Sequence, residues 1–213
     1  MRYKAILFDM DGTLLDTLTD MASAVNHILS VHGWPLRTTE EVRAFVGNGA
    51  RRLMERAVPP DVTGSAFEAV LAEYREWYQA HNCVDTAPYP GIPALLDALA
   101  AAGVKTAVVS NKPDATTKAL AARFFPGLPA FGQRDDVPPK PAPDLVFRAL
   151  ETLGADAADA VYVGDSEVDV ATARNAGLPL AAVSWGFRGR QALAEAGAAV
   201  IVDTAEQLLD VLQ

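Results

Sequence analysis

The stretch AILFDMDGTLLDT, residues 5–17, decides the fold of this chain. Its apolar run, Ala5 to Phe8, shows no alternation, which is typical of a parallel strand that is buried on both faces. The run ends at Asp9 and Asp11, two carboxylates separated by one residue. Carboxylates so close together repel each other and resist burial, so we expect a cation or a reaction to use them.

Further apolar runs follow the same pattern along the chain. They are VKTAVVSN, AVYVGD, LPLAAVS and AAVIVD, and helix-like segments separate them. Apolar strands separated by helices of about ten or more residues indicate a parallel sheet with helices on both faces. We therefore predict an α/β fold with a Rossmann-like parallel sheet.

Residues 17–85 interrupt this alternation and are predicted to be helical almost throughout. Thr38 and Glu41 have the spacing of a capping box at a helix start. GNGARRLMERAV and SAFEAVLAEYREWYQAH predict two more helices, with a Pro-Pro break between them. We expect an α/β core domain of residues 1–16 and 86–213, with residues 17–85 inserted as an α-helical cap domain.

Composition and charge exclude several classes of partner. The net charge of −9 argues against nucleic acid, because phosphate backbones attract basic surfaces. Cys83 is the one cysteine, so no intramolecular disulfide can form, which fits a reducing compartment. No apolar run is long enough to cross a membrane or to serve as a signal peptide. We expect a cytoplasmic monomer or homodimer that binds no membrane.

Several of the predicted strands run directly into polar residues, among them Asp9, Ser110, Asp165 and Ser184. In open parallel sheets, ligands bind beyond the carboxyl ends of the strands. Asp9, Asp11, Ser110 and Asp165 are therefore predicted to converge on one pocket, with the helical insert over it as a lid.

Asp9 and Asp11 suit work on a phosphoryl group. One carboxylate can attack phosphorus while the other delivers a proton to the leaving oxygen. Gly12 permits a turn, and the amides that follow it, at Thr13, can bind the phosphate anion. The simpler alternative is an Asx-turn that only closes a strand.

A second acidic group, Asp165, Glu167 and Asp169, follows another predicted strand. Mg²⁺ binds carboxylate oxygens from a few positions, with water and substrate phosphate completing its octahedron. Taken alone, these acids would only favour the N-terminus of a helix. Together with Asp9 and Asp11 at one sheet edge, they indicate a cation.

Ser110 and Asn111 offer a hydroxyl and an amide that suit equatorial phosphate oxygens. Lys140 lies between two prolines that fix its backbone, and its cation can neutralise both a carboxylate nucleophile and the phosphate. Lys112 is the competing candidate for this role. No histidine lies near Ser110 and no G-x-x-x-x-G-K-[ST] loop is present, which argues against a Ser-His hydrolase and a nucleoside-triphosphate motor.

Taken in order over the whole chain, DMDGT, VVSN, Lys140 and GDSEVD resemble the haloacid dehalogenase superfamily of phosphohydrolases. The resemblance implies that Asp9 is the nucleophile that becomes an aspartyl phosphate. It implies that Asp11 is the general acid/base, with its main-chain oxygen on Mg²⁺, and that Asp165 is a metal ligand. The other positions that match the family are the phosphate-binding Ser110, Asn111 and Lys140, and Asp169 in a supporting place.

The acid at Asp11 is absent from the dehalogenases of this superfamily, so the resemblance implies a phosphatase or a mutase. The insert is similar to the helical cap of the first subclass, and VGNGA, PYPGIPALLDAL and SNKP are most similar to its phosphoglycolate phosphatases. The chain departs from that pattern at LLDT and SEVD. The resemblance implies Mg²⁺-dependent hydrolysis of a small phosphorylated metabolite, 2-phosphoglycolate by preference. The cap residues expected to contact it are Gly47, Asn48, Gly49 and Arg51.

Two other functions fit the same residues. A β-phosphoglucomutase-type enzyme would return the phosphoryl group to a sugar, and another phosphate ester or pyrophosphate can replace 2-phosphoglycolate as substrate. A phospho-acceptor signalling domain also combines an acidic cluster, a hydroxyl residue and a lysine. A receiver domain has no large cap, however, and a long-lived phospho-aspartate without turnover would distinguish it.

Overall fold

The computed structural model describes residues 1–213, and the chain divides into two compact units. The first, here called the α/β unit, contains Met1–Asp16 and Pro88–Gln213. The second, here called the helical unit, contains Thr17–Ala87. The boundary expected from the sequence, between residues 85 and 86, lies two residues before the one observed.

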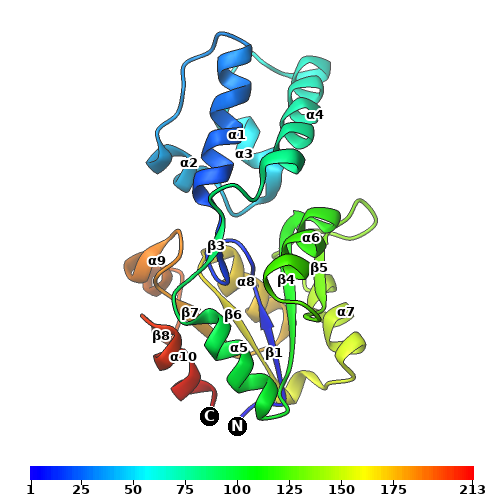
Figure 1. Ribbon diagram of the computed structural model, residues 1–213, viewed down its shortest axis with the longest axis vertical. Helices are drawn as coiled ribbons and strands as arrows, with labels where there is room; N and C mark the ends of the chain where they lie inside the picture. Colours follow the sequence, from blue (N-terminus) through cyan, green and yellow to red (C-terminus); the bar gives the residue numbers. More distant parts are fainter. The chain divides into compact units, whose positions relative to one another are not determined.

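A six-stranded parallel sheet forms the centre of the α/β unit (Figure 1). Its strand order is β5-β4-β1-β6-β7-β8. The bounds are β1 (Ala5–Phe8), β4 (Lys105–Pro113), β5 (Ala130–Gln133), β6 (Ala160–Gly164), β7 (Leu180–Val183) and β8 (Ile201–Val202). In β1, Ala5 lies opposite Lys105 of β4 on one side and Ala160 of β6 on the other. The predicted α/β fold with a parallel sheet is confirmed.

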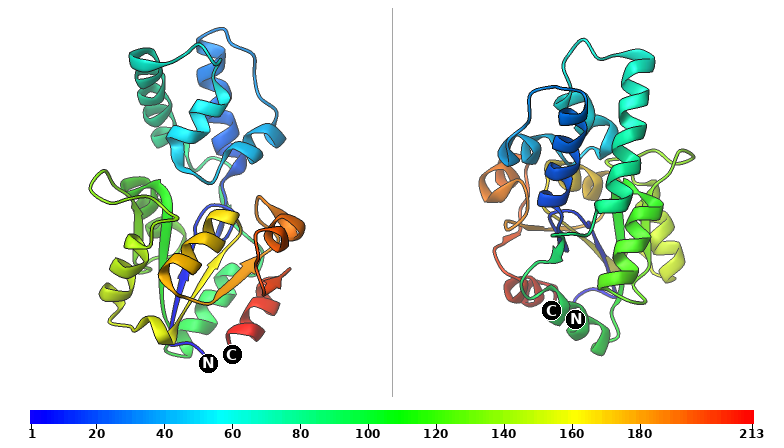
Figure 2. Two further views of the ribbon diagram at one scale, coloured as in Figure 1. Left: turned by 180° about the vertical axis from the view of Figure 1, so that it is seen from behind. Right: turned by 45° about the horizontal axis from the view of Figure 1, so that its top comes forward.

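Helices cover both faces of the sheet, as the unbroken apolar strands predict. Figure 1 shows α5 (Ile92–Ala101) and α10 (Ala205–Leu212) on one face, and Figure 2 shows α7 (Asp144–Leu153) and α8 (Glu167–Ala176) on the other. Leu7 and Tyr162 pack in one buried cluster with Leu145 of α7 and Ala173 of α8. The helix α9 (Gly189–Glu195) contributes Leu193 to a smaller cluster.

Within the six-stranded sheet and its covering helices, the sequence does not predict α6 (Asp114–Phe124) or the edge strand β5. The buried face of α6 consists of Thr116, Thr117, Leu120 and Ala121. Threonine and alanine give little hydrophobic contrast, so the helical period is hard to see. With four residues, AFGQ, β5 has no apolar run either.

The helical unit contains α1 (Leu18–Val31), α2 (Thr39–Phe45), α3 (Gly49–Ala57) and α4 (Gly64–His81). The capping box predicted at Thr38 and Glu41 forms at the start of α2. Buried apolar side chains of α1, such as Val25 and Leu29, lie on the face that packs against the other helices. No helix of the chain has the length and apolar character needed to cross a membrane.

A buried carboxylate in the first turn of α1 fixes the segment that leaves the helical unit. Asp20, 2% exposed, accepts hydrogen bonds from the backbone N–H groups of Val84, Asp85 and Thr86 at 2.9–3.2 Å. The Thr86 hydroxyl donates a further bond at 2.7 Å. The segment continues into β3 (Ala87–Pro88), which pairs with β2 (Leu15–Asp16).

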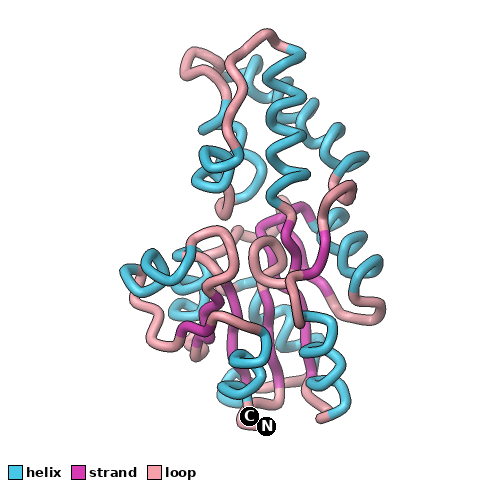
Figure 3. Tube along the Cα trace, turned by 60° about the vertical axis from the view of Figure 1, so that its left-hand side comes forward, coloured by secondary structure: helices cyan, strands magenta, loops and turns pink.

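The two chain termini lie together at one end of the sheet, where Arg2 N–H donates to the Leu212 carbonyl at 3.1 Å. Figure 3 shows the N-terminus, which leads into β1, at this end, and the other strands are parallel to β1, so their carboxyl ends gather at the opposite edge. Ligands of open parallel sheets bind at that edge.

Candidate active site

The residues predicted for the α/β unit come from the ends of three neighbouring strands, β4, β1 and β6. Asp9 and Asp11 follow β1, and Asp165 follows β6. The other contributors are Ser110, Asn111 and Lys112 in β4, Lys140 before α7, and Asp169 in the first turn of α8.

Asp9 is held through one of its two carboxylate oxygens. Its Oδ1 accepts the Met10 N–H at 2.7 Å and lies 2.9 Å from Lys140 Nζ. No donor bonds to Oδ2. The two contacts of Oδ1 fix the side chain in the protein. The side chain is 12% exposed, so it still reaches the surface of the site.

Lys140 joins the carboxylates of two elements. Its Nζ lies 2.8 Å from Asp169 Oδ1 and 2.9 Å from Asp9 Oδ1, and it donates to the Tyr162 hydroxyl at 3.0 Å. The side chain is 2% exposed. With three partners its ammonium group is saturated, and its position relative to Asp9 is fixed.

Asp165 lies almost completely buried, and each of its oxygens has one donor. Thr13 Oγ1 donates to Oδ1 at 3.1 Å, and the Phe187 N–H donates to Oδ2 at 2.7 Å. A carboxylate has about four lone-pair positions, so each oxygen can still bind a cation. Gly12, at φ +85°, passes so close that a Cβ there would overlap this carboxylate.

Asp169 orders the start of α8 and is fully buried. Its Oδ2 accepts the N–H groups of Asp165 and Ser166 at 3.2 and 3.1 Å and the Ser166 hydroxyl at 2.6 Å. With Oδ1 on Lys140, both oxygens are used by the protein. The structure thus gives Asp169 a supporting place behind Asp9 and Asp165.

A divalent cation fits this set of side chains. Carboxylate oxygens of Asp9, Asp165 and Asp169 lie within 4.8 Å of one another. Hard oxygen donors of this kind suit Mg²⁺. The oxygens of Asp169 are already bonded, so Asp9 and Asp165 are the carboxylates with capacity left for an ion.

The electrostatics of the cluster favour added positive charge. Burial raises the pKa of Asp9 to about 7, an effect that Lys140 opposes and that Asp169 increases. Burial, followed by the charges of Asp169 and Asp9, raises the pKa of Asp165 well above its ordinary value. Burial alone would lower the pKa of Lys140, but Asp169 and Asp9 outweigh it and hold that pKa well above its usual range. One lysine does not compensate three carboxylates, and a divalent cation would.

Asp11 and Lys112 form a second ion pair beside the first. Lys112 Nζ lies 2.8 Å from Asp11 Oδ1, with the lysine side chain 3% exposed and the aspartate 19% exposed. Each of the two candidate lysines thus pairs with one aspartate of the DMD stretch, Lys112 with Asp11 and Lys140 with Asp9. Asp11 is the more exposed of the two acids.

Ser110 and Asn111 are both buried and both engaged by the backbone. Ser110 Oγ accepts the Lys112 N–H at 3.2 Å. Asn111 donates to the Lys140 carbonyl at 3.0 Å and accepts the Lys140 N–H at 2.7 Å. Asn111 therefore fixes the backbone of Lys140, and the hydroxyl of Ser110 remains able to donate to an anion.

The other predicted residues have partners outside this cluster. Glu167 is exposed and pairs with Arg188, and Ser184 donates to Asp203. In the helical unit, Arg51 is held by Glu68 through two hydrogen bonds of 2.8 Å. The expected substrate contacts of Gly47, Asn48, Gly49 and Arg51 stay a prediction.

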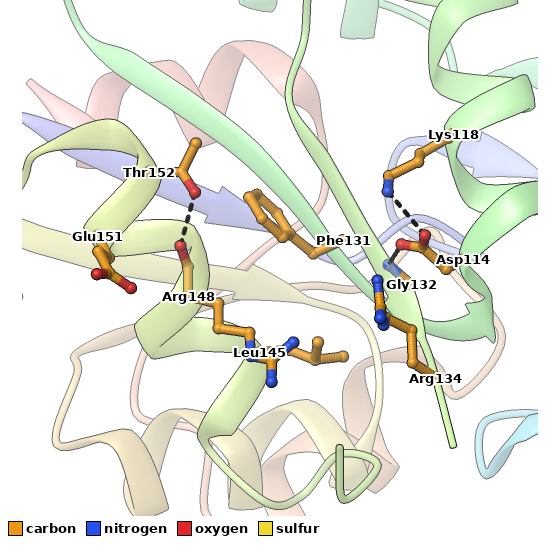
Figure 4. A pocket seen from close by; sticks show the side chains of 9 residues that line it. All are labelled: Asp114, Lys118, Phe131, Gly132, Arg134, Leu145, Arg148, Glu151 and Thr152. Carbon is orange, nitrogen blue, oxygen red and sulfur yellow. Dashed lines mark hydrogen bonds and ion pairs between the residues drawn. The ribbon is translucent and has the colours of Figure 1, made fainter. Parts of the chain in front are cut away.

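A groove of about 330 Å³ lies elsewhere on the α/β unit, between β5, α6 and α7 (Figure 4). None of the predicted site residues lines it. Its cations are compensated nearby, Lys118 by Asp114 at 2.7 Å and Arg134 by Asp136 at 2.9 Å. The groove has neither the acidic cluster nor a free positive charge, so we place the active site at the strand ends.

Sequence reasoning missed Tyr162 and the turn after β7. Tyr162 lies inside the apolar run of β6, where an aromatic residue normally signals only packing. Trp185 Nε1 donates to the Thr13 carbonyl at 3.1 Å, and the Phe187 N–H binds Asp165. The Phe187 donor is a backbone N–H group and leaves no sequence signal. The polar residue at the end of β7, Ser184, does mark the position of the turn.

Comparison with known proteins identifies the class of protein that combines this parallel sheet with acids and a lysine at its carboxyl edge. Residues 6–183 match the family model described as haloacid dehalogenase-like hydrolase, and the chain belongs to that family. A phosphoglycolate phosphatase of Pseudomonas syringae pv. syringae (strain B728a) is 35% identical over 97% of this chain and 78% of its own length. An N-acetylmuramic acid 6-phosphate phosphatase of Pseudomonas aeruginosa is also 35% identical, over 100% of this chain and 96% of its own.

A crystal structure of a candidate phosphoglycolate phosphatase from Lactobacillus delbrueckii subsp. bulgaricus superposes with a TM-score of 0.95. It is 38% identical and covers 100% of this chain and 99% of its own. These similarities place the protein among the phosphatases of the family, the phosphoric monoester hydrolases.

Proposed function

We propose that this protein is a Mg²⁺-dependent phosphomonoesterase that acts through an aspartyl phosphate on Asp9. The observation that carries the proposal is the state of Asp9. Its carboxylate has one oxygen fixed by the Met10 N–H and Lys140, the other without a hydrogen bond, and Asp165 beside it. A buried carboxylate fixed in this way is oriented for attack without further ordering.

In the proposed reaction, an Asp9 oxygen attacks phosphorus and the bond from phosphorus to the ester oxygen breaks. As the substrate binds, Asp11 exchanges its contact with Lys112 for one with the ester oxygen and takes up a proton from solvent, which it then donates to the leaving alkoxide. Asp11 then takes a proton from the water that attacks the aspartyl phosphate, which releases phosphate and restores Asp9.

The surrounding residues hold the transferring group. Lys140 offsets negative charge between Asp9 and the phosphoryl oxygens, while Ser110 and the amides at Thr13 donate to those oxygens. Mg²⁺, held by Asp9, Asp165 and the Asp11 carbonyl, would supply charge neutralisation. Asn111 positions the backbone of Lys140, and Asp169 positions the ammonium group of Lys140.

For the substrate we propose 2-phosphoglycolate, because several similar proteins are named phosphoglycolate phosphatase. N-acetylmuramic acid 6-phosphate is the second candidate, from a relative of equal identity. Both compounds carry a carboxylate as well as a phosphate monoester. An esterase that requires this carboxylate would discriminate strongly against p-nitrophenyl phosphate.

The test is phosphate release from a panel of esters, with Mg²⁺ or with a chelator, by the native protein and by Asp9→Asn. The panel holds 2-phosphoglycolate, N-acetylmuramic acid 6-phosphate, β-glucose 1-phosphate, pyrophosphate and p-nitrophenyl phosphate. We expect Mg²⁺-dependent release that is fastest on 2-phosphoglycolate and lost in Asp9→Asn. Faster release from another ester would change the proposed substrate and leave the proposed mechanism unchanged. Equal phosphate release by Asp9→Asn and the native protein would show that Asp9 is not the nucleophile.

The role of Arg51 is tested separately. Arg51→Ala should raise KM for the preferred ester, whereas Arg52→Ala, which removes the same charge one residue away in α3, should not. Unchanged KM and kcat in Arg51→Ala would remove Arg51 from the substrate contacts.

A further inference from the structure

The turn between β7 and α9 meets the acidic cluster at three consecutive residues, Trp185, Gly186 and Phe187. The reaction proposed above assigns no role to any of them. Each makes a separate contact with the β1 turn or with Asp165, and none of these contacts involves an exposed charge.

The first contact is a hydrogen bond to the carboxylate itself. Phe187 N–H donates to Asp165 Oδ2 at 2.7 Å, a short distance for a backbone donor. A bond from a fixed backbone amide to a charged oxygen is strong and directional. It selects one orientation of the Asp165 side chain.

The second contact is steric. At Gly186 a Cβ would overlap the Gly12 carbonyl oxygen and the Cβ and Oδ2 atoms of Asp165. The φ angle of Gly186 is not in the left-handed region, so backbone conformation does not require glycine here. Close approach does require it, because the turn is pressed against both the β1 turn and Asp165.

The third contact closes a loop of interactions. Trp185 Nε1 donates to the Thr13 carbonyl at 3.1 Å, and Thr13 Oγ1 donates to Asp165 Oδ1 at 3.1 Å. The Trp185 ring also packs at a tilt against Tyr89, with 6.5 Å between centroids. Both oxygens of Asp165 are thus oriented, one directly by the turn and the other through Thr13.

We propose that the turn Trp185–Phe187 is a positioning element for the cation site, which sets the orientation of Asp165 and its distance from the β1 turn that carries Asp9. This inference rests on the proposed Mg²⁺ site. Its consequence is specific. Displacing the turn weakens Mg²⁺ binding through Asp165, whereas the contacts that orient Asp9, with Lys140 and the Met10 N–H, do not involve the turn.

The experiment is a Mg²⁺ titration of the native protein, Gly186→Ala and Gly132→Ala, followed by calorimetry and by the rise in Tm. Gly132→Ala is the matched control, because its Cβ would overlap Asp114 Cα at the edge strand, away from the acids. Gly186→Ala should weaken Mg²⁺ binding about tenfold or more, the effect expected for groups that orient metal ligands. Its kcat should recover at high Mg²⁺, and Gly132→Ala should bind Mg²⁺ like the native protein while losing stability.

Trp185→Phe provides a milder variant should Gly186→Ala not fold. It keeps an aromatic ring against Tyr89 and removes one neutral hydrogen bond, so we expect binding weakened about threefold. Trp34→Phe, in the helical unit, is its control and should change nothing.

Native Mg²⁺ affinity in both Gly186→Ala and Trp185→Phe would overturn the positioning role and leave the metal site intact. Equal weakening in Gly186→Ala and Gly132→Ala would also overturn it, because general packing strain would then be the cause. No Mg²⁺ binding by the native protein would remove the proposed metal site, and this inference with it.

Discussion

Two buried aspartates of this chain, Asp20 in the helical unit and Asp9 in the α/β unit, are held in opposite ways. Asp20 accepts from three backbone N–H groups and a hydroxyl, all neutral donors that surround both of its oxygens. Asp9 has one oxygen without a hydrogen bond and two other acids nearby, and its pKa is raised by burial to about 7.

The difference teaches how to separate structural acids from functional ones. A buried carboxylate that the protein satisfies completely stabilises the fold. A buried carboxylate left partly unsatisfied among like charges destabilises it, and such a group persists where it is used. Asp9→Asn changes an acid that is partly unsatisfied, and Asp20→Ala changes one that the protein satisfies completely.

The largest expected effect is on activity, in Asp9→Asn. An amide cannot attack phosphorus, so we expect phosphate release to fall by about 10⁴-fold or more. The Tm at pH 8 should not fall, because the substitution removes a charge whose burial is unfavourable. Steady-state phosphate assays and thermal melts on the same preparation measure both. A large loss of Tm would show that Asp9, like Asp20, is a structural acid.

Lys140→Met should lower both activity and stability. It leaves Asp9 and Asp169 buried without their shared cation, and breaking a buried pair in this way costs about 3–5 kcal/mol. Urea unfolding measures this loss. Lys118→Met, which breaks an exposed pair with Asp114, should cost about 1 kcal/mol or less. Similar losses in the two variants would contradict the central position given to Lys140.

These first two predictions concern residues that the sequence already singled out, and the reason is topological. Asp9, Lys140 and Asp165 stand at or near the ends of recognisable elements, and parallel strands bring such ends to one edge. The fold class follows from the same unbroken apolar strands. The weak periodicity of α6 and the short β5 give no comparable signal.

The rest of the site depends on which strands are neighbours, and apolar runs do not encode strand order. Tyr162 reaches Lys140 because β6 lies beside β1, and Asn111 reaches the Lys140 backbone because β4 lies on the other side. The donors at Phe187 and Met10 are backbone N–H groups, which every residue except proline carries. The flanking prolines favour Lys140 over Lys112 in the sequence, but they do not show which acid each lysine reaches.

A smaller effect is expected in the helical unit. Asp20→Ala leaves the N–H groups of residues 84–86 without their acceptor, and we expect it to lower the free energy of unfolding by about 2–3 kcal/mol. Asp20→Asn keeps one acceptor oxygen and should lose less. Glu76→Ala, an exposed acid of α4, is the control and should be neutral. Hydrogen exchange should rise at residues 84–86 in Asp20→Ala, while Mg²⁺ affinity stays that of the native protein. A loss of Mg²⁺ binding would contradict the separation between the two kinds of acid.

The stability of the folded protein should also depend on pH, and the sign of this dependence follows from Asp9. The pKa of Asp9 is about 7 in the folded protein and 3.8 as its reference value, so the folded state binds more protons across this interval. Stability without metal should therefore fall as pH rises from about 4 to 7, by up to about 1.4 kcal/mol per pH unit for this group. Mg²⁺ binds the ionised carboxylates, so it should raise Tm more at pH 8 than at pH 5. Thermal melts with Mg²⁺ or with a chelator at the two pH values measure this difference. Asp9→Asn should flatten part of the slope. A slope that is the same in the native protein and in Asp9→Asn would mean that Asp9 is not the acid whose buried charge the cation relieves.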